Sequence, residues 1–199
     1  MTINRLFTFT TVFVMSMFIS SCMFPEEFKS EVNINKDGTF TFEYKGTLTF
    51  VMGRAEEVES GKLTLDDSDI EDLKNELAED KGFESIEYIG HSKFKVKYNK
   101  NGKLTEPFNF IDESIKIFSI APKDDGVIEV KGIKLNKSDI KKLKKIKLTI
   151  DGELKLSTNG KVIEHNASST PSLFGLIGGY VWVVKSLDDP QPKILIDIK

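Results

Sequence analysis

Residues 32–42 read VNINKDGTFTF, and the apolar residues on both sides of the Asp-Gly pair all occupy even-numbered positions. This alternation with a period of two predicts two strands that each bury one face. A two-residue Asp-Gly turn would place Ile34 opposite a polar residue, whereas a three-residue loop over residues 36–38 places it opposite Phe40. We therefore expect a hairpin whose three-residue loop is closed by Gly38 in the left-handed region of backbone space.

Two later stretches combine apolar alternation with an Asn-Gly-Lys turn. Residues 93–103 read KFKVKYNKNGK, and parity again favours a three-residue loop that ends at Gly102. Residues 156–162 read LSTNGKV, which sets Leu156 opposite Val162 in a third hairpin. Three antiparallel hairpins predict a mostly antiparallel sheet.

Two other patterns concern the course of the strands. The alternation that begins at Phe40 continues to Phe50 and Met52, which predicts strand up to that residue. Residues 146–156 keep one apolar parity across Gly152, so the chain either turns there or forms one strand that bends at the glycine. Because glycine inside a strand often marks a curve, we favour the bent strand and a curved sheet.

Two short helices are predicted between the strands, and each opens with Ser-Asp-Ile. The first begins at Ser68 with a capping-box pattern and stops at Gly82, and the second begins at Ser138. The pattern Leu-x-x-Ser-Asp-Ile-x-x-Leu-Lys starts at both Leu65 and Leu135, which indicates either an internal repeat or a coincidence between two capped helices. The predicted fold class is α+β: a curved, mostly antiparallel sheet built of hairpins, with two short amphipathic helices.

The second helix is rich in lysine. Its candidate basic face consists of Lys141, Lys142, Lys144 and Lys145. Lysines late in a helix suit the helix dipole, so a solvated face is one explanation. The functional alternative is contact with anionic lipid headgroups, since each lysine near a membrane surface adds about 1 kcal/mol of attraction.

The first 22 residues indicate where the protein resides. Arg5 and the amino terminus make a positive segment, and residues 6–19 are apolar apart from Thr and Ser. This apolar run is too short for a membrane-spanning helix, which needs about 20 residues, and it suits a secretory signal. The residues that follow resemble the bacterial lipobox: Ile19, Ser20, Ser21 and Cys22.

The lipobox resemblance implies diacylglyceryl transfer to the Cys22 thiol and cleavage after Ser21, with a third acyl chain in many hosts. Two or more acyl chains hold a protein stably at a membrane. The alternative is an ordinary cleaved signal with a chance cysteine. Met23 is not the Asp that usually retains lipoproteins at the inner membrane, so in a Gram-negative host we expect the outer membrane. The predicted organisation is a signal peptide over residues 1–21, a lipidated tether over residues 22–30 and a single α+β envelope domain over residues 31–199.

Composition disfavours several classes of function. The formal net charge of −3 becomes −4 when Arg5 leaves with the signal peptide, which does not fit a nucleic-acid-binding domain. His91 and His165 are the only histidines, and neither has a second His or a Cys at metal-ligand spacing. The sequence has no Gly-x-Ser-x-Gly elbow, Walker loop or dinucleotide fingerprint. We therefore expect no enzyme activity, no catalytic residues, no metal and no cofactor.

The C-terminal part of the chain resembles a known family. Residues 159–167 read NGKVIEHNA, and residues 180–182 read YVW. This part of the chain resembles the LppM-type bacterial lipoprotein domain (the DUF3153 group). The resemblance lies in the order of its features: a turn with Gly-Lys-Val, a His-Asn pair followed by a small residue, a variable loop, and a strand with Trp. The hairpin at residues 33–38 also fits this family, whose members commonly have Pro in place of Asn159. The resemblance implies an α+β domain that faces the outside of the envelope, and it brings no catalytic residues.

The variable loop is apolar and rich in glycine. Residues 171–179 read PSLFGLIGG. Its large apolar residues are Leu173, Phe174, Leu176 and Ile177. Because loops usually run over the surface, this one either plugs the open end of the sheet or forms an exposed lip that contacts the bilayer or a lipid tail.

These observations leave three hypotheses for the function. The first is a non-enzymatic, membrane-anchored lipoprotein that binds a lipid or another apolar ligand in a groove under the curved sheet. The second is a structural or protein-interaction surface lipoprotein with a packed core, whose partner is an envelope protein. The third is a hydrolase of an envelope polymer. A cavity lined by Phe side chains favours the first, a solid core the second, and a cleft with converging carboxylates the third.

We predict that Cys22→Ser releases the protein from the membrane fraction, because it removes the only thiol that can carry acyl chains. Cell fractionation followed by immunoblotting measures the distribution. Ser16→Ala, a change of similar size outside the lipobox, should leave the protein with the membranes. Retention of the Cys22→Ser variant in the membrane fraction would contradict the anchor.

Overall fold

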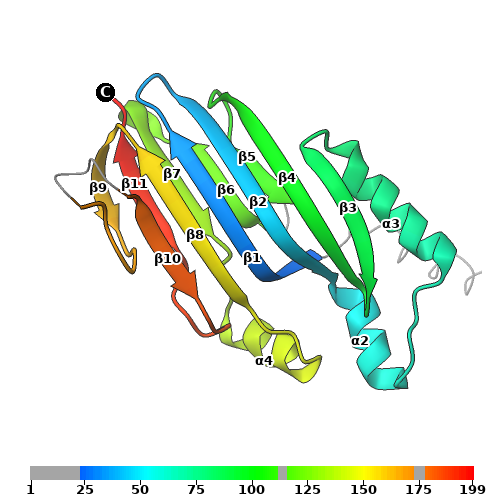
Figure 1. Ribbon diagram of the computed structural model, residues 1–199. Coiled ribbons are helices and arrows are strands. Elements are labelled where there is room, and N and C mark those ends of the chain that lie inside the picture. Colours follow the sequence, from blue (N-terminus) through cyan, green and yellow to red (C-terminus); the bar gives the residue numbers. More distant parts are fainter. Residues whose placement is uncertain (1–22, 112–115, 173–177) are drawn as a thin grey trace, which may run out of the picture.

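The computed structural model describes residues 23–111, 116–172 and 178–199. This part of the chain forms three α-helices and eleven strands in two sheets (Figure 1). The predicted α+β class is confirmed, but the strands form two mostly antiparallel sheets rather than one, and there are three helices rather than two. None of the described helices is long and apolar enough to cross a membrane.

The larger sheet has six strands in the order β10-β8-β1-β2-β4-β3. They are β1 (Met23–Ile34), β2 (Thr39–Phe50), β3 (Phe83–Gly90), β4 (Lys93–Lys103), β8 (Asp151–Thr158) and β10 (Tyr180–Val184). All neighbours are antiparallel except β1 and β8, which run parallel. The starts of β1, β4 and β8 and the ends of β2 and β10 therefore share one end of this sheet, which we name the Met23 end.

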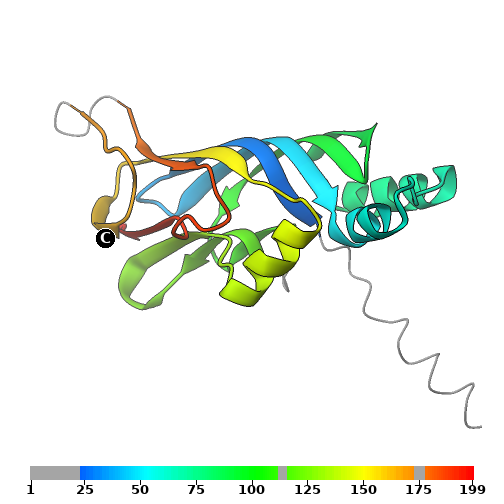
Figure 2. The ribbon, with the colours of Figure 1, turned by 90° about the horizontal axis from the view of Figure 1, so that it is seen from below.

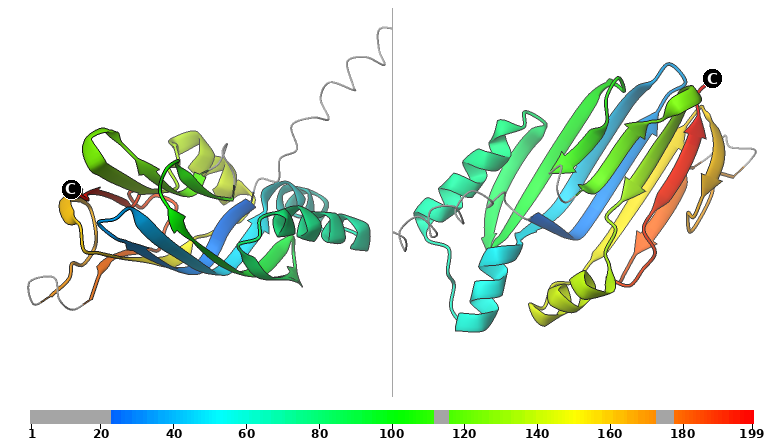
Figure 3. Two further views of the ribbon diagram at one scale, coloured as in Figure 1. Left: turned by 90° about the horizontal axis from the view of Figure 1, so that it is seen from above. Right: turned by 180° about the vertical axis from the view of Figure 1, so that it is seen from behind.

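The smaller sheet has five strands in the order β5-β6-β7-β11-β9. They are β5 (Phe108–Ile111), β6 (Lys116–Pro122), β7 (Val127–Gly132), β9 (Lys161–His165) and β11 (Lys193–Asp197). All its neighbouring strands are antiparallel. This sheet lies against one face of the larger sheet (Figures 2 and 3).

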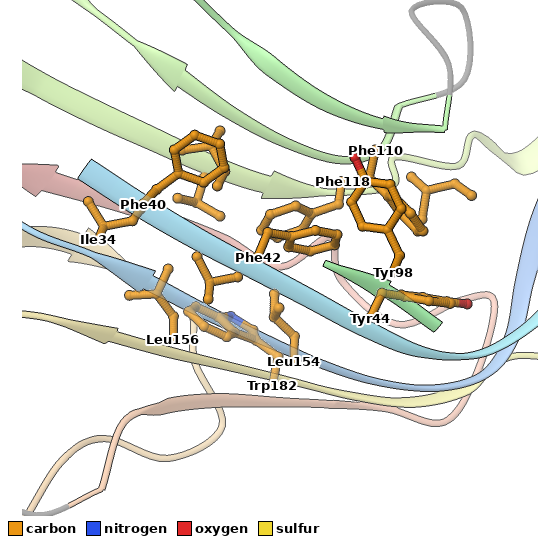
Figure 4. Packing of buried hydrophobic residues seen from close by; sticks show 14 of the residues in the cluster. Ile34, Phe40, Phe42, Tyr44, Tyr98, Phe110, Phe118, Leu154, Leu156 and Trp182 are labelled. Carbon is orange, nitrogen blue, oxygen red and sulfur yellow. The ribbon is translucent and has the colours of Figure 1, made fainter. Parts of the chain in front are cut away.

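The core between the two sheets is largely aromatic (Figure 4). Phe42 of β2 stacks on Phe118 of β6 with ring centroids 4.8 Å apart. Beside this pair, Tyr44 contacts Phe110 of β5 at 4.7 Å. Such pairs contribute about 0.5–1.5 kcal/mol beyond the area that they bury. Aromatic contacts thus hold the two sheets together.

The predicted hairpin between β1 and β2 is confirmed. Ile34 pairs with Phe40, and Val32 pairs with Phe42. Gly38 has φ +80° and donates its N–H to the Asn35 carbonyl at 2.9 Å. The parity of the apolar residues therefore sets the register correctly.

The predicted turn at Gly102 is wrong. β4 continues through Gly102 to Lys103, which pairs with Thr39. β2 is as long as β1 and offers hydrogen-bonding partners along its whole length. The Asn-Gly pair therefore stays in the strand, because pairing with β2 satisfies its backbone groups.

The predicted pairing of Leu156 with Val162 is also wrong. β8 already has β1 on one edge and β10 on the other, so β9 crosses to the smaller sheet and pairs with β11. A Cβ at Gly160 would lie 2.6 Å from Cγ2 of Ile196. This glycine is needed for the close crossing between the sheets rather than for a hairpin turn.

The two predicted helices form, and a third was not predicted. α3 (Asp67–Glu79) and α4 (Lys137–Lys145) begin one residue before the Ser that was expected to open each, because Asp66 and Asn136 are their capping residues. α2 (Val51–Ser60) replaces the predicted end of the second strand. Met52, expected on a buried strand face, is 48% exposed on this helix.

Residues 23–30, predicted as a tether, form the first part of β1 instead. Met23 pairs with Phe50 and is buried. Glu26 is also buried, and its carboxylate accepts hydrogen bonds from Thr49 Oγ1 at 2.5 Å and pairs with Lys93 Nζ at 2.8 Å. A buried charge needs such partners, and these two fix the start of β1 to the neighbouring strands.

The bend predicted at Gly152 takes a different form. β8 begins only at Asp151, so residues 146–150 link it to α4 as irregular chain. Gly152 of β8 and Gly46 of β2 both pair with Phe28 of β1. A Cβ at Gly152 would lie 2.2 Å from the Phe28 ring, and one at Gly46 would lie 2.7 Å from Phe28 Cβ. The two glycines therefore give Phe28 room to lie across its neighbours.

We predict that Gly152→Ala lowers the free energy of unfolding by about 1–3 kcal/mol, because the new methyl group overlaps the Phe28 ring. Urea unfolding followed by circular dichroism measures this. Gly102→Ala is the matched control in another strand, where a Cβ would meet Phe40 at 3.4 Å. Combined with Phe28→Ala, the Gly152→Ala cost should largely vanish. Equal effects at Gly152 and Gly102 would contradict the overlap.

Candidate functional site

A cavity of about 320 Å³ lies between the two sheets, and we name it the inter-sheet cavity. Its apolar wall is formed by Phe28, Phe42, Tyr44, Phe110, Ile117, Phe118, Ile150, Leu154, Val184 and Leu187. Pockets for small apolar molecules typically have volumes of roughly 300–1,000 Å³ and such a lining. Figure 4 shows how the aromatic side chains of the two sheets approach each other in this region.

Small residues on the larger sheet make room for the cavity. Ser30 lies on β1 between Tyr44 of β2 and Leu154 of β8, which are its partners across the sheet. Phe28, two residues before Ser30 and on the same face of β1, lies between Gly46 and Gly152. Side chains of directly paired residues point to the same face of a sheet. The inner face therefore has a hollow along β1, and Ser30 forms its floor.

The interior of the inter-sheet cavity is nearly free of charge. Burial raises the pKa of the Tyr44 phenol above its ordinary value, so the phenol stays neutral. The Tyr44 hydroxyl donates to the Thr47 carbonyl at 3.3 Å. Ser30 is 5% exposed and lines the inter-sheet cavity. Because a hydroxyl can both donate and accept, Ser30 is a candidate partner for a polar atom of a ligand.

The segment between β10 and β11 forms a polar rim. Asp189 accepts hydrogen bonds from the N–H groups of Lys185 and Ser186 at 2.7 and 2.9 Å. Gln191 Nε2 donates to the Gly132 carbonyl of β7 at 2.6 Å. The bonds to Asp189 are internal to this segment, and the bond from Gln191 attaches it to the smaller sheet.

Helix α4 packs against residues that line the inter-sheet cavity. Its Leu143 packs with Phe24, Leu148, Ile150, Val184 and Leu187 in a separate apolar cluster. Lys144 Nζ lies 2.5 Å from the Asp188 carboxylate and so links the helix to the rim. The other lysines of the predicted basic face, Lys141, Lys142 and Lys145, are exposed and have no ion-pair partner among the described residues.

Two residues in the C-terminal part, Asn166 and Trp182, join the two sheets. Trp182 of β10 is buried, and its Nε1 donates to Asn166 Oδ1 at 2.8 Å. Asn166 also accepts from the Lys193 N–H of β11 and donates to the Gln191 carbonyl, both at 2.8 Å. Asn166 and Trp182 therefore hold the rim of the cavity in place, which is a structural role.

Several predicted site residues lie outside the described part of the chain. These are Ile19, Ser20, Ser21 and Cys22 of the lipobox, and Leu173, Phe174, Leu176 and Ile177 of the apolar loop. Their roles stay predictions. Tyr180, just after the loop, pairs with Leu156 near the end of the larger sheet that lies opposite Met23.

The sequence predicts a groove under the sheet but not the residues that line it. Phe28 and Ser30 fall in the predicted tether, and the other lining residues come from strands far apart in the chain. The usable signal was the occurrence of small residues at inward-facing strand positions, namely Ser30, Gly46 and Gly152.

Comparisons with known proteins give a limited result. No family model and no curated protein matches the chain. Among solved structures, it is similar to the folded domain of LppM from Mycobacterium tuberculosis, with 10% sequence identity and a TM-score of 0.42 over 87% of this chain and 91% of that chain. At this identity and TM-score the similarity assigns no function, and membership of the LppM-type family stays a prediction.

We predict that the Asp188 carboxyl titrates below its ordinary pKa of 3.8, because Lys144 donates a hydrogen bond to it. Carbon-13 NMR titration of the side chain measures this. A depressed pKa means that the pair stabilises the fold above pH 3.8 and that this contribution is lost as the pH falls through the lower value. Lys144→Met should raise the pKa and Lys145→Met should not. Identical titration in both variants would contradict the pairing.

Proposed function

We propose that this chain is a non-enzymatic, lipid-anchored protein of a bacterial cell envelope that holds a lipid chain, or another apolar ligand, in the inter-sheet cavity. The observation that carries the proposal is a cavity of about 320 Å³ with an aromatic wall, the buried hydroxyls of Ser30 and Tyr44, and a polar rim. An apolar chain would contact Phe42, Phe118 and Leu154, and its polar end would lie toward Ser30 or the rim.

The energetics of packing support a ligand. The apolar wall of the inter-sheet cavity offers dispersion contacts to a molecule that enters it. A domain with the alternative role, that of a structural or interaction module with a packed core, does not need such a wall. An apolar ligand would add contacts with the wall and so stabilise the fold.

The proposal includes no catalytic step. The carboxylates near the inter-sheet cavity belong to Asp188, which is paired with Lys144, and to Asp189, which accepts backbone hydrogen bonds. A hydrolase needs a carboxylate or a nucleophile that is available to the substrate. These two groups instead organise the rim.

Native mass spectrometry tests the proposal on a chain that begins at Met23, since residues 23–199 contain every described element. Expressed in bacteria, it should carry a noncovalent lipid mass that disappears on denaturation. Ser30→Leu should remove this mass and raise the melting temperature, because the larger side chain fills the floor of the cavity.

Thr41→Leu is the matched control, because it adds a similar side chain to the exposed face of β2. It should keep the bound lipid. A protein without bound mass, also after incubation with envelope lipids, would overturn the proposal.

A further inference from the structure

A second cavity, of about 300 Å³, lies outside the core beside α2, and we name it the Arg54 cavity. It is formed where α2, the turn between β3 and β4 and Lys147, the second residue after α4, meet. Its lining contains the cationic side chains Arg54, Lys62 and Lys147 and the His91 ring, together with one acidic residue, Glu57. A concentration of cations in a concave surface is the arrangement that recognises an anion.

Glu57 is occupied by its own partners. Its side chain is buried, Ser92 Oγ donates to Oε1 at 2.7 Å, and Arg54 Nη1 lies 3.3 Å from Oε2. His91 Nδ1 lies 3.7 Å from the same oxygen. The carboxylate therefore holds Arg54 and the turn in place.

A surplus of positive charge remains. The formal charge of the lining is +2, from Arg54, Lys62 and Lys147 against Glu57. Lys62 and Lys147 have no ion-pair partner in the part of the chain that the structure describes, and Arg54 Nε is a buried donor without an acceptor. The Arg54 cavity thus has more donors and more positive charge than the protein itself satisfies.

The backbone at Lys147 and His91 favours glycine. Lys147 has φ +58° and follows α4 at the position where helices commonly end in glycine, with the Leu148 N–H bound to the Leu143 carbonyl. His91 has φ +54°, in the same left-handed region. A side chain that persists where glycine would be more stable indicates that the side chain itself is needed.

The Arg54 cavity lies at the Met23 end of the larger sheet. Phe50, the residue before α2, pairs with Met23 and donates its N–H to the Ser92 carbonyl at 2.8 Å. Two strand spacings, about 10 Å, therefore separate this turn from the residue that follows Cys22. Leu63, which lines the cavity together with the cations, is 62% exposed. Exposed apolar residues beside cations are typical of contact with lipid headgroups.

We propose that the Arg54 cavity binds a phosphate group, and that its source is the headgroup of an anionic lipid in the bilayer to which the domain is anchored. The choice of a lipid source rests on the proposed function, because it assumes the anchor at Cys22. The cations and the size of the cavity apply equally to free phosphate, so the experiment must separate the two sources.

The test uses the chain that begins at Met23, so that neither the acyl anchor nor the apolar segment at residues 6–19 masks weaker binding. Cosedimentation measures binding to three kinds of vesicle. The first contains phosphatidylcholine alone, the second phosphatidylcholine with phosphatidylglycerol, and the third phosphatidylcholine with oleate at the same surface charge as the second. We expect binding to phosphatidylglycerol that exceeds binding to oleate. Lys147→Gly and Lys62→Gln should each weaken it about five-fold or more. Lys147→Gly should also raise the melting temperature, which excludes unfolding as the cause.

Lys145→Ala is the matched control on the exposed face of α4, and its effect should be clearly smaller. The proposal would be overturned if Lys145→Ala and Lys147→Gly weakened vesicle binding equally, or if the protein bound oleate vesicles as well as phosphatidylglycerol vesicles. Either result would mean that general surface charge causes the binding. Calorimetric binding of inorganic phosphate that depends on Lys147, without vesicle binding, would overturn the lipid source and support a free phosphate ligand. Lys147→Gly should not change the lipid mass bound in the inter-sheet cavity, so the two proposals fail separately.

Discussion

The central strand β1 is hydrogen-bonded along both edges, to β2 and to β8, and the rest of the domain depends on this double pairing. Its side chains occupy the middle of the space between the sheets, so both neighbours must accommodate Phe28. Gly46 and Gly152 do so because they have no side chain. One step further along β1, Ser30 is too small to fill the space between Tyr44 and Leu154. The close packing of one aromatic ring and the inter-sheet cavity therefore have a common origin in the small residues along β1.

The parts of the fold that the sequence predicts correctly are decided locally. The turn at Gly38 has the required residue in the loop and the correct parity on both sides, and its strands have no nearer partner. Asn-Gly pairs, which are turn residues of the same kind, do not form the predicted hairpins at Gly102 and Gly160. The outcome at these two positions depends on which strand edges are already paired. β2 keeps Gly102 in a strand, and the filled edges of β8 send the chain at Gly160 into the other sheet. Occupied edges are a property of the assembled sheet, which a local pattern does not contain.

The candidate site is harder to predict than the fold, because its shape comes from missing side chains. Apolar alternation identifies Tyr44 and Leu154 as inward-facing, but it does not show that the residue between them on the sheet is Ser30, which is too small to fill the space. The Arg54 cavity has the same difficulty. Its cations are far apart in the chain, and the alternation through Met52 concealed the helix that carries Arg54. The best indicator of the Arg54 cavity is the positive φ of His91 and Lys147. A backbone angle is known only from the structure, so the sequence could not supply this indicator.

The position of Met23 determines how an acylated Cys22 would orient the domain. Met23 is buried and paired with Phe50, so a lipid on the preceding residue would attach to the sheet itself rather than to a flexible tether. The topology places the Arg54 cavity and the rim after β10 at this end, whereas the hairpin at Gly38 is about 35 Å away along β1. A lipid that leaves the bilayer would therefore meet the cations and the rim before it meets the hairpin end of the larger sheet. Recognition of the headgroup and shelter of the acyl chain would then be neighbouring events, because both depend on where the central strand begins.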